Sequence, residues 1–61
     1  MNLTVLEKGR YITTRTDYAQ RINLYFTDSK FFEVIYEPNE NVIKDVLEID
    51  LERATNVMNG Y

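Results

Sequence analysis

Hydrophobic and polar residues alternate along residues 21–27, with the period of two that a half-buried β-strand requires. One side of this strand would carry the apolar residues Ile22, Leu24 and Phe26. Residues 31–37 are rich in aromatic and β-branched side chains, which favour strands. The polar residues 28–30 that separate the two segments are typical of a turn. Together these segments predict an antiparallel hairpin.

The pairing within this hairpin depends on the length of its turn. A two-residue turn pairs Leu24 with Glu33, which places a carboxylate among apolar residues. A three-residue turn pairs Leu24 with Val34 and Tyr25 with Glu33, so that similar side chains share a face. We expect the three-residue turn, although Lys30 stands where such loops favour glycine or asparagine.

A second hairpin is predicted near the start of the chain. Lys8-Gly9 separates two alternating segments, and a tight turn there would pair Val5 with Ile12. One long strand with a bulge at Gly9 is the alternative. Residues 1–37 would then contain four short strands.

Residues 40–58 have apolar side chains at helical spacing. One half of a helical wheel is filled by Val42, Ile43, Val46, Leu47, Ile49, Leu51, Ala54, Val57 and Met58. Pro38 would end the last strand, Asn39 would cap the helix and Gly60 would stop it. We therefore predict a helix from about residue 40 to residue 58.

Residues 46–51 also alternate with a period of two, which supports a second interpretation. They would then form a fifth strand, and Asp50 or a neighbour would cap a shorter terminal helix. In the long helix, Asp50 falls among apolar residues, where an unpaired carboxylate is costly. We expect it to pair there with Arg53 or with a basic strand residue such as Arg15 or Arg21. A buried carboxylate that senses a partner is the alternative.

The fold class that follows is α+β, with residues 1–61 as a single domain. We expect an antiparallel β-meander of about four strands packed on one C-terminal helix, and a small five-stranded barrel-like sheet with a short terminal helix is the alternative. A domain of this length buries only about 60% of the surface of its unfolded chain. Because the chain has no cysteine and hence no disulfide, we expect support from a second copy or from a partner protein.

The chain contains no histidine, cysteine or tryptophan. Histidine and cysteine carry most acid–base, nucleophilic and zinc chemistry, so we expect a protein that is not an enzyme and has no cofactor. On a strand, Glu48, Asp50 and Glu52 would share one side and could hold a hard cation, but we favour a solvated acidic surface without metal. No apolar segment reaches the roughly 20 residues of a membrane span, and no secretion signal is visible, so we expect a cytoplasmic protein.

Charge is divided unevenly along the chain, whose net charge is −3. Residues 1–30 have five basic and three acidic residues, or +2, whereas residues 31–61 have two basic and seven acidic residues, or −5. One helix can cover only one face of the sheet, so the other face would expose aromatic and apolar side chains. The residues predicted to bind a partner are Tyr11, Tyr25, Phe31 and Ile35 through apolar contact, and Glu48, Asp50 and Glu52 through charge.

This exposed sheet face and the acidic helix predict a small protein-binding accessory or regulatory module that acts by occupancy, such as an inhibitor, an adaptor or a small subunit. Its partner would be another protein or a second copy in a homodimer. The alternative is a single-stranded nucleic-acid-binding domain, because bases stack on exposed aromatic rings and cations follow the phosphate backbone. The residues that would serve it are Arg10, Tyr11, Arg15, Arg21 and Tyr25. The acidic net charge disfavours this alternative.

Overall fold

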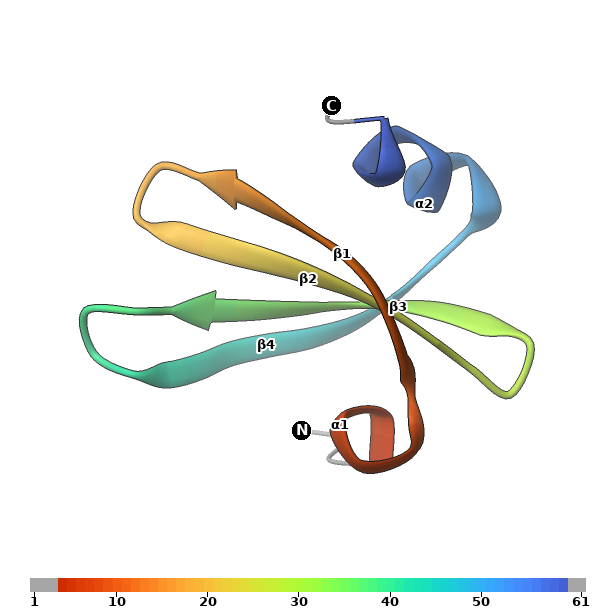
Figure 1. The fold of residues 1–61 in the computed structure, drawn as a ribbon, viewed down its shortest axis with the longest axis horizontal. Helices are drawn as coiled ribbons and strands as arrows, with labels where there is room; N and C mark the ends of the chain where they lie inside the picture. Colours follow the sequence, from red (N-terminus) through yellow and green to blue (C-terminus); the bar gives the residue numbers. More distant parts are fainter. Residues whose placement is uncertain (1–3, 60–61) are drawn as a thin grey trace.

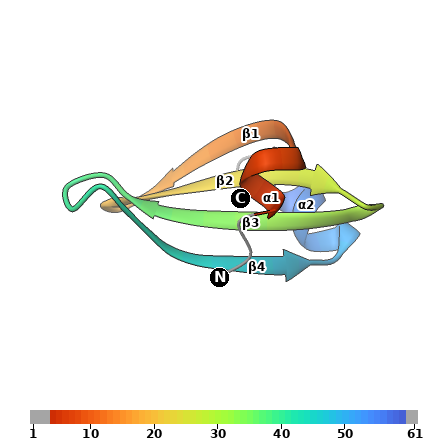
Figure 2. The ribbon, with the colours of Figure 1, turned by 90° about the horizontal axis from the view of Figure 1, so that it is seen from below.

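Within residues 4–59, which the computed structural model describes, four antiparallel strands form one open sheet in the order β1-β2-β3-β4 (Figure 1). The elements are α1 (Thr4–Lys8), β1 (Arg10–Asp17), β2 (Gln20–Thr27), β3 (Lys30–Glu37), β4 (Val42–Ile49) and α2 (Leu51–Met58). Seen face-on in Figure 2, α1 lies in front of the sheet and α2 lies behind it. The predicted α+β meander packed on a C-terminal helix is confirmed. The barrel-like alternative is wrong because β1 and β4 lie at opposite edges and do not pair.

The β2–β3 hairpin has the two-residue turn that the sequence analysis rejected. Asp28 and Ser29 have φ angles of 53° and 62°, as a type I′ turn requires, and this turn matches the twist of the strands that it joins. Leu24 therefore pairs with Glu33, and the predicted pairing of Leu24 with Val34 is wrong. Every side chain of β3 consequently points to the face opposite the predicted one.

An ion pair between a buried glutamate and a half-exposed arginine stabilises this register. Glu33 is only 4% exposed, yet its Oε2 lies 3.1 Å from Nη2 of Arg53, which reaches it from α2. The Arg53 Nε also donates to the same oxygen at 3.2 Å. An inward-facing carboxylate is costly without a partner, and the distant arginine offsets that cost.

The start of the chain forms a single helical turn, so the predicted hairpin at Lys8-Gly9 is wrong. The N–H of Gly9 donates to the carbonyl oxygen of Val5 at 2.9 Å and closes α1. A Cβ atom at position 9 would lie 2.2 Å from that oxygen, so any larger residue would clash with the backbone of α1. The side chain of Val5 is fully buried.

The predicted helix over residues 40–58 is wrong in its first half. The second interpretation, a strand followed by a shorter terminal helix, is confirmed, although the strand covers residues 42–49. Val42–Ile49 is β4, which pairs with β3 along its length, and only Leu51–Met58 is helical. Asp50 is the N-cap of α2, because its Oδ1 accepts the N–H of Arg53 at 2.8 Å. Residues 38–41 form a turn, so Asn39 caps no helix, and the predicted stop at Gly60 lies outside the described residues.

The two faces of the sheet carry different side chains. The face that packs against α2, here the α2 face, carries Ile22, Leu24, Phe26, Phe31, Glu33, Ile35, Leu47 and Ile49. Leu24 forms the core there with Ala54 and Val57 of α2, and Ile12, Phe31 and Ile49 pack against it. The opposite face, here the α1 face, carries Thr14, Thr16, Arg21, Asn23, Tyr25, Val34, Tyr36 and Ile43. Each helix is short, so neither covers its whole face (Figure 2).

Candidate functional site

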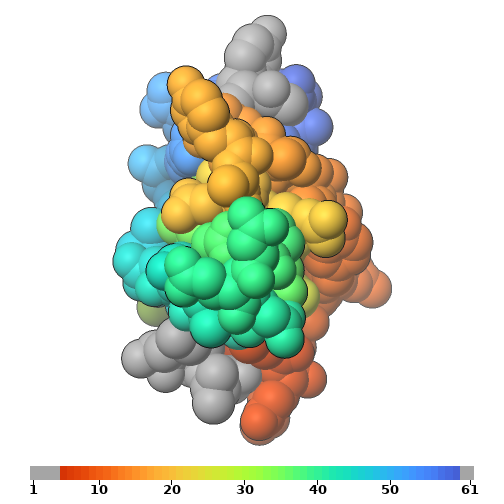
Figure 3. All heavy atoms as spheres, turned by 90° about the vertical axis from the view of Figure 1, so that its left-hand side faces the viewer, coloured from red at the N-terminus to blue at the C-terminus, as the bar shows by residue number. Residues whose placement is uncertain are grey.

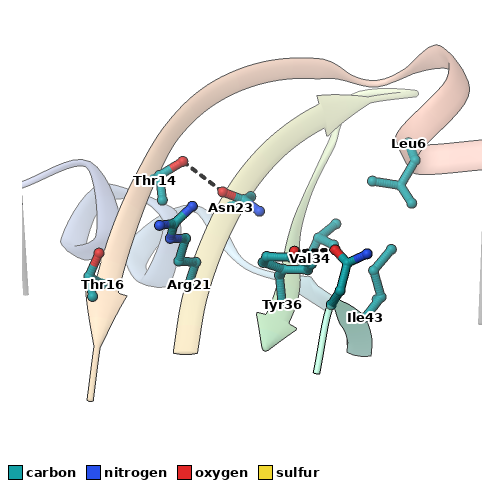
Figure 4. Close-up of a pocket in the computed structure, with 9 residues that line it drawn as sticks. Leu6, Thr14, Thr16, Arg21, Asn23, Val34, Tyr36 and Ile43 are labelled. Carbon is teal, nitrogen blue, oxygen red and sulfur yellow. Dashed lines mark hydrogen bonds between the residues drawn. The ribbon is translucent and has the colours of Figure 1, made fainter. Parts of the chain in front are cut away.

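An open groove of about 800 Å³ lies on the α1 face. It is lined by Leu6 of α1, by Thr14, Thr16, Arg21, Asn23, Val34, Tyr36 and Ile43 of the four strands, and by Asn41 of the β3–β4 turn (Figure 4). The β1–β2 and β3–β4 turns project side by side at one end of the molecule (Figure 3). The side chains that line the groove come from positions as far apart in the sequence as Leu6 and Ile43.

Hydrogen bonds between side chains fix the polar groups of the groove. The Thr14 hydroxyl lies 2.6 Å from Oδ1 of Asn23 and 2.7 Å from the hydroxyl of Tyr11. On the other side of the groove, the hydroxyl of Tyr36 donates to Oδ1 of Asn41 (Figure 4). These pairs connect β1 to β2, and β3 to the turn that follows it, so the groove is preformed along both of its sides.

Arg21 is the one charged side chain among the described residues that line the groove. The ion pairs formed by the described residues join Lys30 to Glu48, Lys44 to Glu40 and Arg53 to Glu33. Arg21 belongs to none of them, so within residues 4–59 its guanidinium has no ion-pair partner and its donors face water or a ligand. The groove therefore combines one positive charge with neutral hydrogen-bonding groups and the apolar side chains of Leu6, Val34 and Ile43.

The structure divides the predicted apolar patch between the two faces of the sheet. Tyr11 and Tyr25 lie on the α1 face, with ring centroids 5.8 Å apart in an edge-to-face contact. Phe31 and Ile35 lie on the α2 face, where Phe31 packs against the core. The prediction that these four residues share one exposed surface is wrong, because it depended on the three-residue turn.

The three predicted acidic contact residues do not converge. Glu48 lies on β4, not on a helix, and its carboxylate is 3.6 Å from the ammonium group of Lys30. Asp50 is exposed and caps α2, so neither the predicted side-chain pair with Arg53 nor the buried partner-sensing carboxylate is correct. Glu52 lies in the first turn of α2. No group of three potential metal ligands occurs among residues 4–59.

The residues predicted for a nucleic-acid surface are likewise separated. Arg10 and Arg15 pair with Phe26 and Ile22 and therefore lie on the α2 face. Arg21 lies on the α1 face, together with the two tyrosines. The tyrosine rings contact each other edge to face, so the pair does not form a row of parallel stacking platforms.

Sequence reasoning identified Arg21 as a candidate but missed the rest of the groove. Thr14, Thr16 and Asn23 are neutral side chains that carry no motif, and the segment of Tyr36 and Asn41 was assigned to a strand end and a helix start. The available signal was the alternation of Arg21 and Asn23 along β2. It becomes informative only when the two-residue turn is known, because that turn fixes which residues of β3 lie beside them.

No helix within the described part of the chain is long and apolar enough to cross a membrane. No protein-family model matches the chain, and no curated protein or solved structure is significantly similar to it. The groove and the chemistry of its side chains are therefore the features from which a function can be inferred.

Proposed function

We propose that the protein is a small, non-enzymatic protein-binding module of the cytoplasm that acts by occupancy, holding a segment of a partner protein in the groove on the α1 face. The observation that carries this proposal is the groove itself, whose volume of about 800 Å³ lies in the range of roughly 300–1,000 Å³ that is usual for binding pockets. The absence of cysteine from the chain fits a reducing compartment.

The lining of the groove supports contact rather than catalysis. None of the described residues that line it is a histidine, a cysteine or a carboxylate, so it holds no pair of groups suited to proton transfer near neutral pH. Its hydroxyl and amide groups are instead suited to hydrogen bonding with a peptide backbone.

Charge complementarity indicates what kind of segment would bind. Arg21 is a planar, permanently charged donor that binds carboxylates through paired hydrogen bonds. Leu6 and Ile43 add partly exposed apolar side chains to the same groove, whereas Val34 is only 1% exposed. We therefore propose an acidic segment that carries at least one apolar side chain as the occupant.

A panel of labelled eight-residue peptides tests this proposal. Fluorescence polarisation would compare an acidic–apolar peptide, its basic counterpart and a neutral counterpart at the same ionic strength. We expect only the acidic peptide to bind, and we expect the changes in amide chemical shifts to be confined to residues that line the groove. If no acidic peptide binds, the proposal is wrong.

A pair of tryptophan variants tests the location. Thr16→Trp introduces a large side chain into the groove, whereas Gln20→Trp places the same side chain at an exposed position outside the groove lining. Binding should be lost in Thr16→Trp and retained in Gln20→Trp. Equal binding by both variants would place the contact elsewhere on the surface.

Two further measurements distinguish the alternative occupants. Light scattering coupled to gel filtration detects a homodimer, and a dimer that dissociates in Thr16→Trp would identify a second copy as the occupant. A labelled oligothymidylate tests the nucleic-acid alternative, which predicts affinity that falls steeply as the salt concentration rises.

A further inference from the structure

The two edges of the sheet differ in how well they are protected against pairing with another strand. At the β4 edge, Oδ1 of Asp45 accepts the N–H of Val46 at 2.8 Å, so a backbone donor is already occupied by a side chain. The β3–β4 register shifts at Ile35/Tyr36, which bends this edge. Lys44 and Glu48 add charges on the same strand. Capped donors, bulges and edge charges are the usual devices that prevent strand addition.

The β1 edge also carries charges and a register shift, but it lacks the capped donor. Its eight residues, Arg10–Asp17, pair with β2 on one side only, and alternate backbone groups point away from the sheet. Among residues 4–59, no side chain forms a hydrogen bond with the backbone of β1. The register shift between Tyr11 and Thr13 is confined to the first part of the strand. The second half of β1, which ends at its arrowhead in Figure 2, lies away from both helices.

The charge at this edge is positive on both faces of the sheet. Arg10 and Arg15 lie on the α2 face, and Arg21, which pairs with Thr16, lies on the α1 face. None of these three arginines takes part in an ion pair with another described residue. Asp17 is the one acidic residue of β1, so the strand and Arg21 together have a net charge of 3 − 1 = +2.

The groove and the β1 edge form one continuous surface, because Thr14 and Thr16 belong to both. A strand added beside β1 would direct alternate side chains to the α1 face, next to these threonines, with Arg21 one strand farther away on β2. The side chains between them would lie on the α2 face, next to Arg15. An acidic segment would thus find an arginine on either face.

We infer that the acidic segment of the proposed function binds as a fifth strand along the β1 edge, with alternate side chains entering the groove. This inference rests on the proposed function and adds the conformation of the bound segment. Main-chain hydrogen bonds to β1 supply much of the affinity, and Arg15 and Arg21 supply the preference for acidic residues. A second copy of β1 is a poorer occupant, because it would bring two strands of the same positive charge together.

The test uses the acetylated and amidated eight-residue peptide Glu-Glu-Val-Thr-Glu-Glu-Val-Thr, which as a strand places glutamates on both faces and valines on one of them. Two counterparts accompany it, one with lysine in place of glutamate and one with alternate backbone amides N-methylated on the edge that would pair. The N-methylated peptide keeps the charge but cannot form the ladder. We expect it to bind more than tenfold more weakly, because several backbone hydrogen bonds are lost.

Hydrogen exchange of the complete protein locates the new ladder. With the glutamate peptide bound, outward-pointing amides of β1 should exchange at least tenfold more slowly, while those of β4 should not change. Arg15→Gln and Arg21→Gln should each weaken binding about two- to fivefold, as expected for exposed ion pairs. The matched control, Lys44→Gln on the β4 edge, should bind as the wild type does.

The outcomes separate the two proposals. If the peptide binds while the β1 amides are unaffected and N-methylation makes no difference, strand addition is wrong and the groove proposal survives. Slower exchange at β4 would also overturn the inference. If neither the glutamate peptide nor any other acidic peptide binds, both proposals fail. A concentration-dependent dimer with protected β1 amides in the absence of peptide would replace the partner segment by a second copy.

Discussion

Replacing Arg53 by methionine tests how the sheet tolerates a carboxylate in its interior. The Glu33 side chain is 6% exposed and its Oε2 is contacted by two nitrogens of Arg53, whereas the side chain of Arg53 is 43% exposed. Methionine keeps much of the apolar stem and removes the guanidinium. The variant therefore leaves Glu33 buried without its partner.

The expected loss of stability follows from this asymmetry in exposure. Breaking a fully buried ion pair costs about 3–5 kcal/mol, and breaking an exposed pair costs about 0.2–1 kcal/mol. Because water reaches Arg53 but hardly reaches Glu33, we expect Arg53→Met to lower the free energy of unfolding by about 1.5–3 kcal/mol. In the double variant Glu33→Leu/Arg53→Met, an apolar pair replaces both charges, so most of the loss should be recovered.

Urea unfolding followed by far-ultraviolet circular dichroism measures the free energies of the wild type, both single variants and the double variant. Lys44→Met is the matched control, because the Lys44–Glu40 pair is exposed on both sides and its loss should cost less than about 0.5 kcal/mol. The reasoning is refuted if Arg53→Met unfolds at the wild-type urea midpoint. It is also refuted if the losses of the two single variants simply add in the double variant.

Three further substitutions give expected outcomes. Asp50→Ala removes the N-cap of α2 and should lower the free energy of unfolding by about 1 kcal/mol. For a domain of this size, that loss lowers the melting temperature by about 4–8 °C. Asp50→Ser keeps a capping oxygen and should be nearly neutral in a thermal melt. Ser29→Gly should raise the urea midpoint, because Ser29 has a φ of 62° that glycine adopts without strain; a lower midpoint would contradict the type I′ assignment. Gly9→Ala would place a Cβ 2.2 Å from the Val5 carbonyl oxygen. Amide exchange should therefore show that α1 opens while β2 and β3 stay protected. Unchanged protection of α1 would contradict the close approach of the two residues.

The local patterns predicted β2 and β3 well, because each has a strong strand signal of its own. The alternation in residues 21–27 falls within β2, Gln20–Thr27, and residues 31–37 fall within β3, Lys30–Glu37. Their mutual register could not be predicted in the same way. It depends on Arg53, which lies 20 residues beyond Glu33 and approaches it only through the packing of α2.

The C-terminal third of the chain carries two periodicities at once, and tertiary pairing decides between them. Residues 46–51 alternate as a strand would, and the same apolar residues fill one half of a helical wheel. Pairing with β3 favours the strand, and Asp50 then becomes an N-cap instead of a buried charge. The one residue that broke the helical pattern was thus the signal that the helix begins after it.

The candidate site could be predicted only in part, for the same reason. Arg21 was identified by its charge, but its neighbours in the groove depend on the strand register and on the β3–β4 turn. The predicted patch of Tyr11, Tyr25, Phe31 and Ile35 failed because a shift of one residue exchanges the faces of a strand.

The hydrogen bond from the Val46 N–H to the Asp45 carboxylate has a consequence for how copies of this chain behave at high concentration. Head-to-tail pairing of β1 on one molecule with β4 on the next would repeat without limit and build a fibre. Because a donor of β4 is already occupied, this contact is disfavoured, and pairing of β1 with a second β1 stops at two copies. The molecule can therefore leave β1 accessible without polymerising.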